Sequence, residues 1–259
     1  SVRSSRRSML PLMALAVGPR GFGKTNAGLL MAEQLSEQGW VSVLIDPEGE
    51  LESVYGAAVA DAEELCQRLT LRDVPIVVVS AKDALDFIPY GQVILEVADE
   101  LRKPLFVCID EGQLFSAARK RADGVGEACD IIAQFAERGR KRALDLFVTA
   151  LRYTGTLHRT MFSNPNLKLI GAQEDPTAWS ALAPMFRSSG IEFKDLNALG
   201  PGEFVLFSRR GIEKTKMPMA EGLKKVAPKA KPVKRTLPAT FSQWDRAMRE
   251  IPTERLEAL

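Results

Sequence analysis

An α/β fold with a mostly parallel central sheet flanked by helices is predicted for this chain of 259 residues by two features of its sequence. First, short apolar runs, typical of strands covered on both faces, alternate with segments of helical periodicity up to about residue 172. This alternation indicates parallel strands joined by right-handed crossovers. Second, residues 18–25 (Gly-Pro-Arg-Gly-Phe-Gly-Lys-Thr) lie between the first apolar run and the first helical segment.

Residues 18–25 match the phosphate-binding pattern G-x-x-x-x-G-K-[ST]. A glycine-rich loop can turn its backbone N–H groups around a phosphate chain, and the following helix adds the positive end of its dipole there. Lys24 is expected to reach the β and γ phosphates, and the Thr25 hydroxyl is expected to bind Mg²⁺. The residues predicted to bind the nucleotide are Gly18, Pro19, Arg20, Gly21, Phe22, Gly23, Lys24, Thr25 and Asn26.

Composition limits the classes of function. The hydrophobic content of 46% is ample for a buried core, and the net charge of +2 gives no global signature of nucleic-acid binding, so any basic surface must be local. Three cysteines without metal-type spacing indicate a reduced cytosolic protein. The single histidine, His158, excludes metal sites that are built on several histidines. No apolar run approaches the roughly 18 residues of a membrane span.

The expected elements follow the periodicity along the chain. Strands are predicted at residues 12–17, 41–45, 75–79, 104–109, 144–150 and 167–171, and a terminal hairpin at residues 203–207 and 212–217. Helices are predicted at residues 26–38, 61–71, 90–101 and 175–182, and two further helical segments flank residues 119–124. A basic arm (residues 1–9) precedes the first strand. A basic, extended Lys/Pro linker (residues 223–239) leads to a C-terminal amphipathic helix (residues 240–259).

Asp110 and Glu111 follow directly on the apolar run that ends at Ile109. An acid at this strand end can hold Mg²⁺ opposite Thr25. A glutamate one residue further on can reach a water in line with the γ phosphate and act as its general base. An acidic helix N-terminus is the alternative explanation for the pair. In combination with the phosphate loop, the pair predicts nucleotide hydrolysis.

Four segments in this order resemble the HerA/FtsK superfamily of DNA-pumping ATPases, within the RecA-like class that has an added strand and a catalytic glutamate. They are residues 18–25, 44–50 (Leu-Ile-Asp-Pro-Glu-Gly-Glu), 107–111 (Val-Cys-Ile-Asp-Glu) and 138–152 (Arg-Gly-Arg-Lys-Arg-Ala-Leu-Asp-Leu-Phe-Val-Thr-Ala-Leu-Arg). Residues 202–207 are similar to the Gly-Glu hairpin that closes such domains. The resemblance implies a RecA-like P-loop ATPase domain over residues 10–222, with ATP and Mg²⁺ as cofactors.

The sequence departs from this family at two places. The family usually has Gln before Arg at the end of its fifth strand, where this chain has Leu151 and Arg152. That glutamine is thought to sense the γ phosphate, so the role falls into doubt here or passes to Thr149 or Arg152. The phosphate loop begins at residue 18, so the family's N-terminal barrel is expected to be absent. We therefore expect a minimal motor domain, as in viral genome-packaging ATPases.

The resemblance also implies a ring, usually of six subunits, with ATP at each interface. Arg140 matches the position of an arginine that reaches into the neighbouring site, where a guanidinium can stabilise charge on the transferred phosphoryl group. The assignment among the nearby basic residues is open, and a solvated basic turn is the alternative; these residues are Arg138, Lys141 and Arg142. The predicted catalytic residues are Lys24, Glu111, Arg140 and Arg152, and the predicted Mg²⁺ ligands are Thr25 and Asp110.

Contacts with DNA are predicted at Arg119, Lys120 and Arg121, which could project into a central channel and contact phosphates without regard to sequence. An exposed charged loop is the alternative. The six basic residues between positions 224 and 235 indicate either a DNA-binding tail or a linker.

The predicted function is an ATP-hydrolysing ring motor that translocates double-stranded DNA. Viral genome packaging is favoured over HerA-like DNA processing, conjugation, chromosome segregation and antiviral defence. Two non-motor classes are the alternatives: a small-molecule kinase and a nucleotide-switched assembly protein. The phosphate loop of such an assembly protein carries an extra lysine near its start, where this chain has Pro19 and Arg20. The expected partners are double-stranded DNA, further copies of the chain, and a portal or nuclease. The expected location is the cytoplasm of a bacterial or archaeal host, with a virus as one source of the gene.

Overall fold

The computed structural model describes residues 12–118, 123–153, 155 and 157–226, all within one compact unit, Ser1–Val226. The expected basic arm, most of the expected linker and the expected C-terminal helix lie outside the described residues, as do Arg119, Lys120 and Arg121. Among the helices that are described, none is long and apolar enough to cross a membrane.

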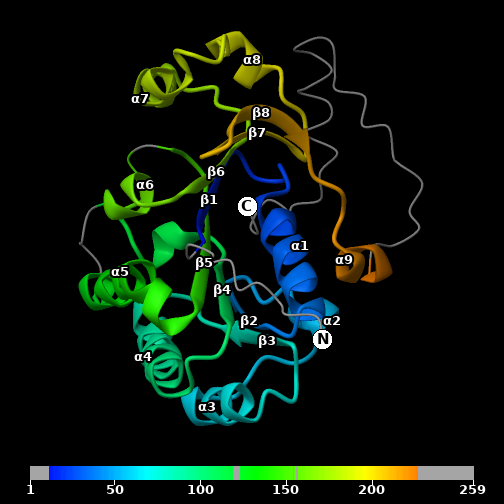
Figure 1. The fold of residues 1–259 in the computed structure, drawn as a ribbon, viewed down its shortest axis with the longest axis vertical. Coiled ribbons are helices and arrows are strands. Elements are labelled where there is room, and N and C mark those ends of the chain that lie inside the picture. The colour runs from blue at the N-terminus through cyan, green and yellow to red at the C-terminus, as the bar shows by residue number, and fades with distance from the viewer. Residues whose placement is uncertain (1–11, 119–122, 154, 156, 227–259) are drawn as a thin grey trace, which may run out of the picture. The chain divides into compact units, whose positions relative to one another are not determined.

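In the described part of the chain, eight strands form one sheet in the order β3-β2-β4-β5-β1-β6-β7-β8 (Figure 1). They are β1 (Met13–Val17), β2 (Val41–Asp46), β3 (Ile76–Ser80), β4 (Leu105–Ile109), β5 (Leu144–Ala150), β6 (Leu167–Ile170), β7 (Glu203–Ser208) and β8 (Gly211–Lys216). The first six in this order are parallel, and the β7–β8 hairpin adds antiparallel to β6. The predicted α/β fold with a mostly parallel sheet and a terminal hairpin is confirmed.

Strand β5 lies between β1, which leads into the phosphate loop, and β4, which leads into Asp110 and Glu111. Its residue Ala150 pairs with Val17 of β1, and its residue Val148 pairs with Ile109 of β4. The three strands are parallel, so they end at the same edge of the sheet, where open α/β sheets bind their ligands. This is the added strand that the resemblance implied.

Helices cover both faces of the sheet (Figure 1). They are α1 (Lys24–Glu37), α2 (Glu52–Tyr55), α3 (Ala62–Leu71), α4 (Ala84–Leu101), α5 (Val125–Arg142), α6 (Thr160–Ser163), α7 (Pro176–Phe186), α8 (Phe193–Asn197) and α9 (Glu221–Val226). Helix α1 shares one core cluster with Ala14 and Ala16 of β1, whereas α3, α4 and α5 share the other with Leu15 and Val17. Because successive strand residues point to opposite faces, burial of both faces explains the continuous apolar runs.

Helix α1 packs closely against the sheet at Gly28. A Cβ atom placed on Gly28 would lie 2.6 Å from Sγ of Cys108 and 3.1 Å from the ring of Phe147. Any side chain there would push the helix away from β4 and β5. Burial raises the pKa of the Cys108 thiol well above its usual value, so this cysteine is a packing residue rather than a nucleophile. The contact holds the start of α1 against the strands that carry the acids.

Three expectations about local structure are wrong. The helical segment expected directly after Glu111 is a single 3-10 turn (Gly112–Leu114). Helix α4 begins at Ala84 rather than at residue 90, because the Asp83 side chain caps it and Pro89 is accommodated in its first turns. The first residues of the expected linker are not extended, since they belong to α9.

Asp145 gives a prediction about stability that does not involve the phosphate loop, because it lies where β5 begins, at the opposite edge of the sheet. Its Oδ1 accepts a hydrogen bond from the backbone N–H of Leu12 at 2.8 Å, yet burial raises its pKa to about 6. The unfolded chain has an aspartate pKa of about 3.9. The folded state therefore binds the proton more tightly, and its stability falls as the pH rises from about 4 to 6.

Replacing Asp145 with Asn keeps the acceptor for Leu12 and removes the buried charge. At about pH 7.5 we expect the free energy of unfolding of Asp145→Asn to exceed that of the unmodified chain by about 2 kcal/mol. At about pH 4 the difference should largely vanish, because the carboxyl group is then protonated in the folded state. Urea titrations at the two pH values measure both quantities, and equal stabilities at the higher pH would contradict the prediction.

Candidate nucleotide-binding and hydrolysis site

Residues 18–25 leave the end of β1 and lead into α1, whose first residue is Lys24. The loop needs backbone conformations that glycine adopts readily, with φ of +75° at Gly21 and +84° at Gly23. Gly23 is also the Ncap residue of α1, and it has no side chain that could cap the helix. The first backbone N–H groups of α1 and the positive end of its dipole therefore face an anion bound in the loop.

Lys24 is enclosed by this loop. The residue is 5% exposed, and its Nζ donates a hydrogen bond to the backbone carbonyl of Pro19 at 2.9 Å. Burial lowers the pKa of Lys24, while the carboxylates of Glu111 and Asp110 oppose that effect. A buried ammonium group inside a glycine-rich loop, with two acids near it, fits contact with a phosphate chain.

Thr25 and Asp110 meet at the sheet edge. The Thr25 hydroxyl donates a hydrogen bond to Oδ2 of Asp110 at 2.9 Å, although the two residues are 85 positions apart. Such a pair fits Mg²⁺, which takes one or two protein ligands and completes its octahedron with water and phosphate oxygens. Within the described ranges, no cluster of three or more His, Cys, Asp or Glu side chains could hold a metal without the nucleotide. The structure thus brings together the two predicted Mg²⁺ ligands.

Thr149, buried near the end of β5, connects the two acids. Its hydroxyl donates to Oδ1 of Asp110 at 2.5 Å and accepts from the backbone N–H of Glu111 at 3.0 Å. The hydroxyls of Thr25 and Thr149 therefore engage both oxygens of the Asp110 carboxylate and fix its orientation. The sequence had suggested Thr149 as a γ-phosphate sensor. In the structure its hydroxyl already positions both acids.

Glu111 adopts a left-handed backbone conformation, with φ +47° and ψ +48°, which costs a residue with a side chain about 1–2 kcal/mol. The tight turn depends on Gly112, where a Cβ atom would lie 2.3 Å from Cγ1 of Val148. Strained conformations of this kind cluster at functional sites. Here the strain holds the Glu111 carboxylate two residues beyond the end of β4 at Ile109.

Gln113 was not predicted as a site residue. Its Nε2 donates a hydrogen bond to the Glu111 carboxylate, and its Oε1 is buried without a hydrogen-bond partner in the described part of the chain. A buried amide that bonds the carboxylate from one end can orient it. The sequence did contain a signal. Gln113 is a polar residue two positions after Glu111, where neither a strand pattern nor a helix pattern requires a polar side chain.

The Thr149 hydrogen bonds can be tested directly. In Thr149→Val the side chain keeps its shape, but Asp110 loses a donor and the Glu111 N–H loses its acceptor. If the site hydrolyses ATP, we expect kcat to fall about ten- to a hundredfold, as for the loss of other groups that orient metal ligands, together with a weaker dependence on Mg²⁺. Steady-state hydrolysis at varied Mg²⁺ measures this. Thr215→Val in β8 is the matched control, and unchanged kinetics in Thr149→Val would contradict the assignment.

Asn26 uses its side chain differently from the prediction that it contacts nucleotide. Its Nδ2 donates to the backbone carbonyl of Pro218 at 2.7 Å, and its Oδ1 accepts from the backbone N–H of Ala220 at 2.8 Å. A contact between Asn26 and a phosphate would therefore rest on its backbone N–H, which belongs to the first turn of α1.

Arg152 is exposed just beyond the end of β5. Together with Pro19 of the phosphate loop and Leu151, it lines a cavity of about 370 Å³. Gln173, which was not predicted, lies in the same lining, is 4% exposed, and donates through Nε2 to the carbonyl of Ala172 at 2.8 Å. The cavity borders the loop, so Arg152 and Gln173 both lie next to the phosphate site.

Asp46 ends β2 beside the strand of Asp110. Its carboxylate accepts hydrogen bonds from the backbone N–H groups of Gly49 at 3.1 Å and Leu51 at 2.7 Å, so it closes the turn that follows β2. Burial raises the pKa of Asp46, these hydrogen bonds oppose the shift, and the charge of Asp110 adds to it. Its hydrogen bonds indicate a role in shaping the turn beside the site.

The basic residues predicted to act between subunits are not part of this cluster. Those at positions 138, 140, 141 and 142 fall in the last turns of α5, not in a turn after it, and their side chains are not described. Because α5 leads into the first residue of β5, its end lies at the sheet edge opposite the phosphate loop. The candidate DNA contacts at positions 119–121 lie outside the described residues.

Comparisons with known proteins place the fold. No family model matches the chain, and no curated protein matches it by sequence. Among solved structures, the genome packaging NTPase B204 from Sulfolobus turreted icosahedral virus 2, in complex with ATP-gammaS, is 14% identical with a TM-score of 0.62, and the match covers 81% of this chain and 98% of that one.

Two other solved structures are similar. The pCW3 conjugation coupling protein TcpA with ATPgS is 14% identical with a TM-score of 0.60, over 82% of this chain and 62% of that one. VirB4 of Thermoanaerobacter pseudethanolicus is 12% identical with a TM-score of 0.59, over 80% of this chain and 90% of that one. At these identities the likeness shows the fold alone, and the α/β fold expected from the sequence is the one that these solved structures share.

Proposed function

We propose that this chain is a subunit of an ATP-hydrolysing ring motor that translocates double-stranded DNA. The observation that carries the proposal is the network in which Thr25 and Thr149 hold Asp110, while Thr149 also bonds the backbone of Glu111. One acid is thereby reserved for the metal and the next is left for a water. This division of roles supports hydrolysis over phosphoryl transfer to a metabolite.

The residues suggest how hydrolysis would proceed. Lys24 and the backbone N–H groups of the loop would hold the β and γ phosphates of ATP. Thr25 and Asp110 would hold Mg²⁺, which when bound neutralises charge on the phosphate oxygens. Glu111 would accept a proton from the water that attacks the γ phosphorus. The bond from that phosphorus to the bridging oxygen breaks, and ADP and phosphate are the products.

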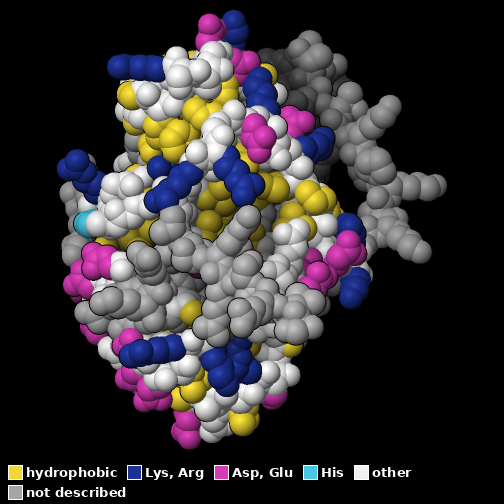
Figure 2. Space-filling view, in the orientation of Figure 1, with side chains coloured by type: hydrophobic (Ala, Val, Ile, Leu, Met, Phe, Trp, Pro, Cys, Tyr) yellow, Lys and Arg dark blue, Asp and Glu magenta, His cyan; other side chains and the backbone are white. Residues whose placement is uncertain are grey.

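Translocation of DNA is supported by the fold, which the chain shares with a genome packaging NTPase and a conjugation coupling protein. On the face seen in Figure 2, the described Lys and Arg side chains are interspersed with Asp and Glu rather than gathered into one basic stripe. We therefore assign DNA contact to the local basic segments, Arg119, Lys120 and Arg121 and the run at residues 224–235, with salt-sensitive binding that does not depend on sequence.

Viral genome packaging is the role we favour, because the chain matches 98% of a genome packaging NTPase at a TM-score of 0.62. A portal would be the partner in that role, and the host cytoplasm the location. A DNA-processing or defence translocase of the HerA type, with a nuclease as partner, is the second candidate, because the fold is also shared with a conjugation coupling protein.

The test is ATP hydrolysis with and without double-stranded DNA, combined with the mass of the assembly in the presence of ATP and DNA. A motor predicts faster hydrolysis with DNA, at a mass of several subunits. Hydrolysis that is indifferent to DNA in a monomer would reject the motor. Phosphorylation of a metabolite in place of release of phosphate would show a kinase.

A further inference from the structure

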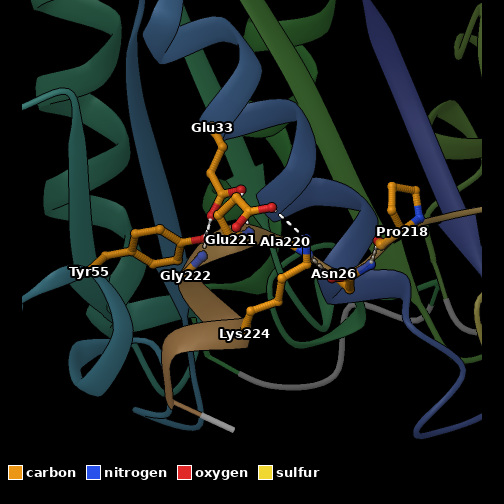
Figure 3. A network of polar contacts seen from close by, with 8 residues as sticks. All are labelled: Asn26, Glu33, Tyr55, Pro218, Ala220, Glu221, Gly222 and Lys224. Carbon is orange, nitrogen blue, oxygen red and sulfur yellow. Dashed lines mark hydrogen bonds and ion pairs between the residues drawn. The ribbon is translucent and has the colours of Figure 1, made fainter.

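Residues 217–222, which we call the strap, run from the end of β8 into the first two residues of α9 and lie along helix α1 (Figure 3). Asn26 in the first turn of α1 binds the strap at Pro218 and Ala220, through the two hydrogen bonds given above. Two turns further along, the Glu33 carboxylate accepts from the backbone N–H of Glu221 at 2.8 Å and of Gly222 at 2.8 Å. The strap is thus fixed at two places on the helix that follows the phosphate loop.

The far end of the strap is also closely packed. The Tyr55 hydroxyl of α2 donates to Oε1 of Glu33 at 2.7 Å, so one carboxylate joins three segments (Figure 3). A Cβ atom on Gly222 would lie 2.6 Å from Cγ1 of Val54 and 2.9 Å from the Tyr55 ring, which leaves room for glycine alone. The backbone of the strap is therefore held in one position at Gly222.

The near end of the strap is connected to the phosphate loop by backbone hydrogen bonds. The N–H of Gly202, in the turn before β7, donates to the carbonyl of Phe22 at 3.0 Å. The N–H of Met217 donates in turn to the carbonyl of Gly202 at 2.8 Å. These two hydrogen bonds, through Gly202, connect the phosphate loop to the first residue of the strap.

A nucleotide bound in this site would have a defined orientation relative to the strands. Its γ phosphate belongs near Asp110 and Glu111, which follow β4, on one side of β1. The nucleoside is at the other end of the phosphate chain. The strand order places β6, β7 and β8 on the other side of β1, and the strap leaves the end of β8 beside the first turn of α1. We therefore expect the nucleoside of a bound nucleotide to lie at the strap.

Met219 lies between the two strap residues that Asn26 holds, and it is 51% exposed, one of the few large apolar side chains with that exposure among the described residues. The thioether of methionine is flexible and polarisable and packs well on aromatic rings. From these observations we infer that the strap is the nucleoside subsite, with Met219 packing on the base and with Asn26 and Glu33 as positioning residues. The inference rests on the proposed nucleotide site.

Binding of two ligands separates the strap from the phosphate loop. ATP and inorganic tripolyphosphate, each with Mg²⁺, share the phosphate contacts, but only ATP reaches the strap. In Met219→Ala we expect the Kd for ATP to rise about five- to tenfold and the Kd for tripolyphosphate to stay unchanged, as measured by calorimetry. Leu71→Ala, at another exposed apolar residue, in α3, is the matched control and should change neither.

The positioning role is tested at a distance from the phosphates. Glu33→Gln replaces one acceptor of the strap's N–H groups by a donor, so we expect a rise of about threefold or more in the Kd for ATP alone. Glu37→Gln, at an exposed position in the last turn of α1, is its control. A thermal melt of each variant checks that it is folded.

Each outcome decides one question. If the unmodified chain binds neither ligand, the proposed nucleotide site itself fails. If it binds both and Met219→Ala binds ATP as tightly, the strap does not form the nucleoside subsite. An equal loss for both ligands in Met219→Ala or Glu33→Gln would also overturn the inference, because the strap would then only support the phosphate loop.

Discussion

Replacing Glu111 with Gln is expected to lower kcat for ATP hydrolysis by at least about a hundredfold, because a general base contributes 10²–10⁴ to the rate. Binding of ATP should change little. The backbone N–H of Glu111 still donates to Thr149, the left-handed turn before Gly112 is retained, and the amide has the shape of the carboxylate. What is lost is the carboxylate that we propose as the acceptor of the proton of the attacking water.

Two measurements separate this loss from a loss of binding. Single-turnover hydrolysis reports the chemical step, and the Kd for ATP reports occupancy of the loop. Glu213→Gln, at an exposed position of β8, is the matched control and should match the unmodified chain in both. Hydrolysis by Glu111→Gln within threefold of the unmodified rate would remove Glu111 from the role of base.

The strands were predictable from sequence because both faces of this sheet are buried. Val43 and Leu44 point to opposite faces of β2 and both are core residues, so the run is apolar on both faces, with Ser42 as its one polar interruption before Asp46. Strand β5 was predicted with the bounds that the structure has, residues 144–150. The phosphate loop and the acid pair were predictable for a related reason, because their chemistry needs a fixed order of residues within a few positions.

Features that depend on distant residues could not be predicted. The Asn26 side chain bonds residues 192 and 194 positions away, and nothing near it in sequence signals that. The position of Thr149 was noted, but its two hydrogen bonds depend on the insertion of β5 between β1 and β4. The turn after Glu111 was mistaken for a helix, because the contact of Gly112 with Val148 across the sheet is a tertiary constraint.

The position of α5 determines which subunit's phosphate site Arg140 could reach. This residue lies two positions before the end of the helix, and the helix ends where β5 begins. The phosphate loop lies where β5 ends, and the seven residues of β5 separate the two edges by about 20 Å at 3.3 Å per residue. A side chain cannot span that distance to its own site. If Arg140 acts in hydrolysis, the site on which it acts belongs to a neighbouring subunit.

We therefore expect Arg140→Ala to lower kcat by about a thousandfold or more, as for arginines supplied in trans to a phosphoryl group, with little change in the stability of the monomer. Arg187→Ala, at an exposed arginine after α7, is the matched control. Steady-state hydrolysis in assemblies of confirmed mass measures the effect. Activity of Arg140→Ala at the level of the unmodified assembly would exclude the role.

Mixing two inactive variants distinguishes an arginine that acts in trans from one that acts through the fold of its own subunit. In an assembly of equal parts Arg140→Ala and Glu111→Gln, about a quarter of the interfaces pair an intact Glu111 with an intact Arg140 of the neighbour, so hydrolysis should return to about that fraction. If Arg140 served its own subunit, every site would lack one of the two groups and the mixture would stay inactive. Recovery therefore requires that each active site be completed by the next chain, which is the arrangement that a ring motor needs to couple hydrolysis to movement between subunits.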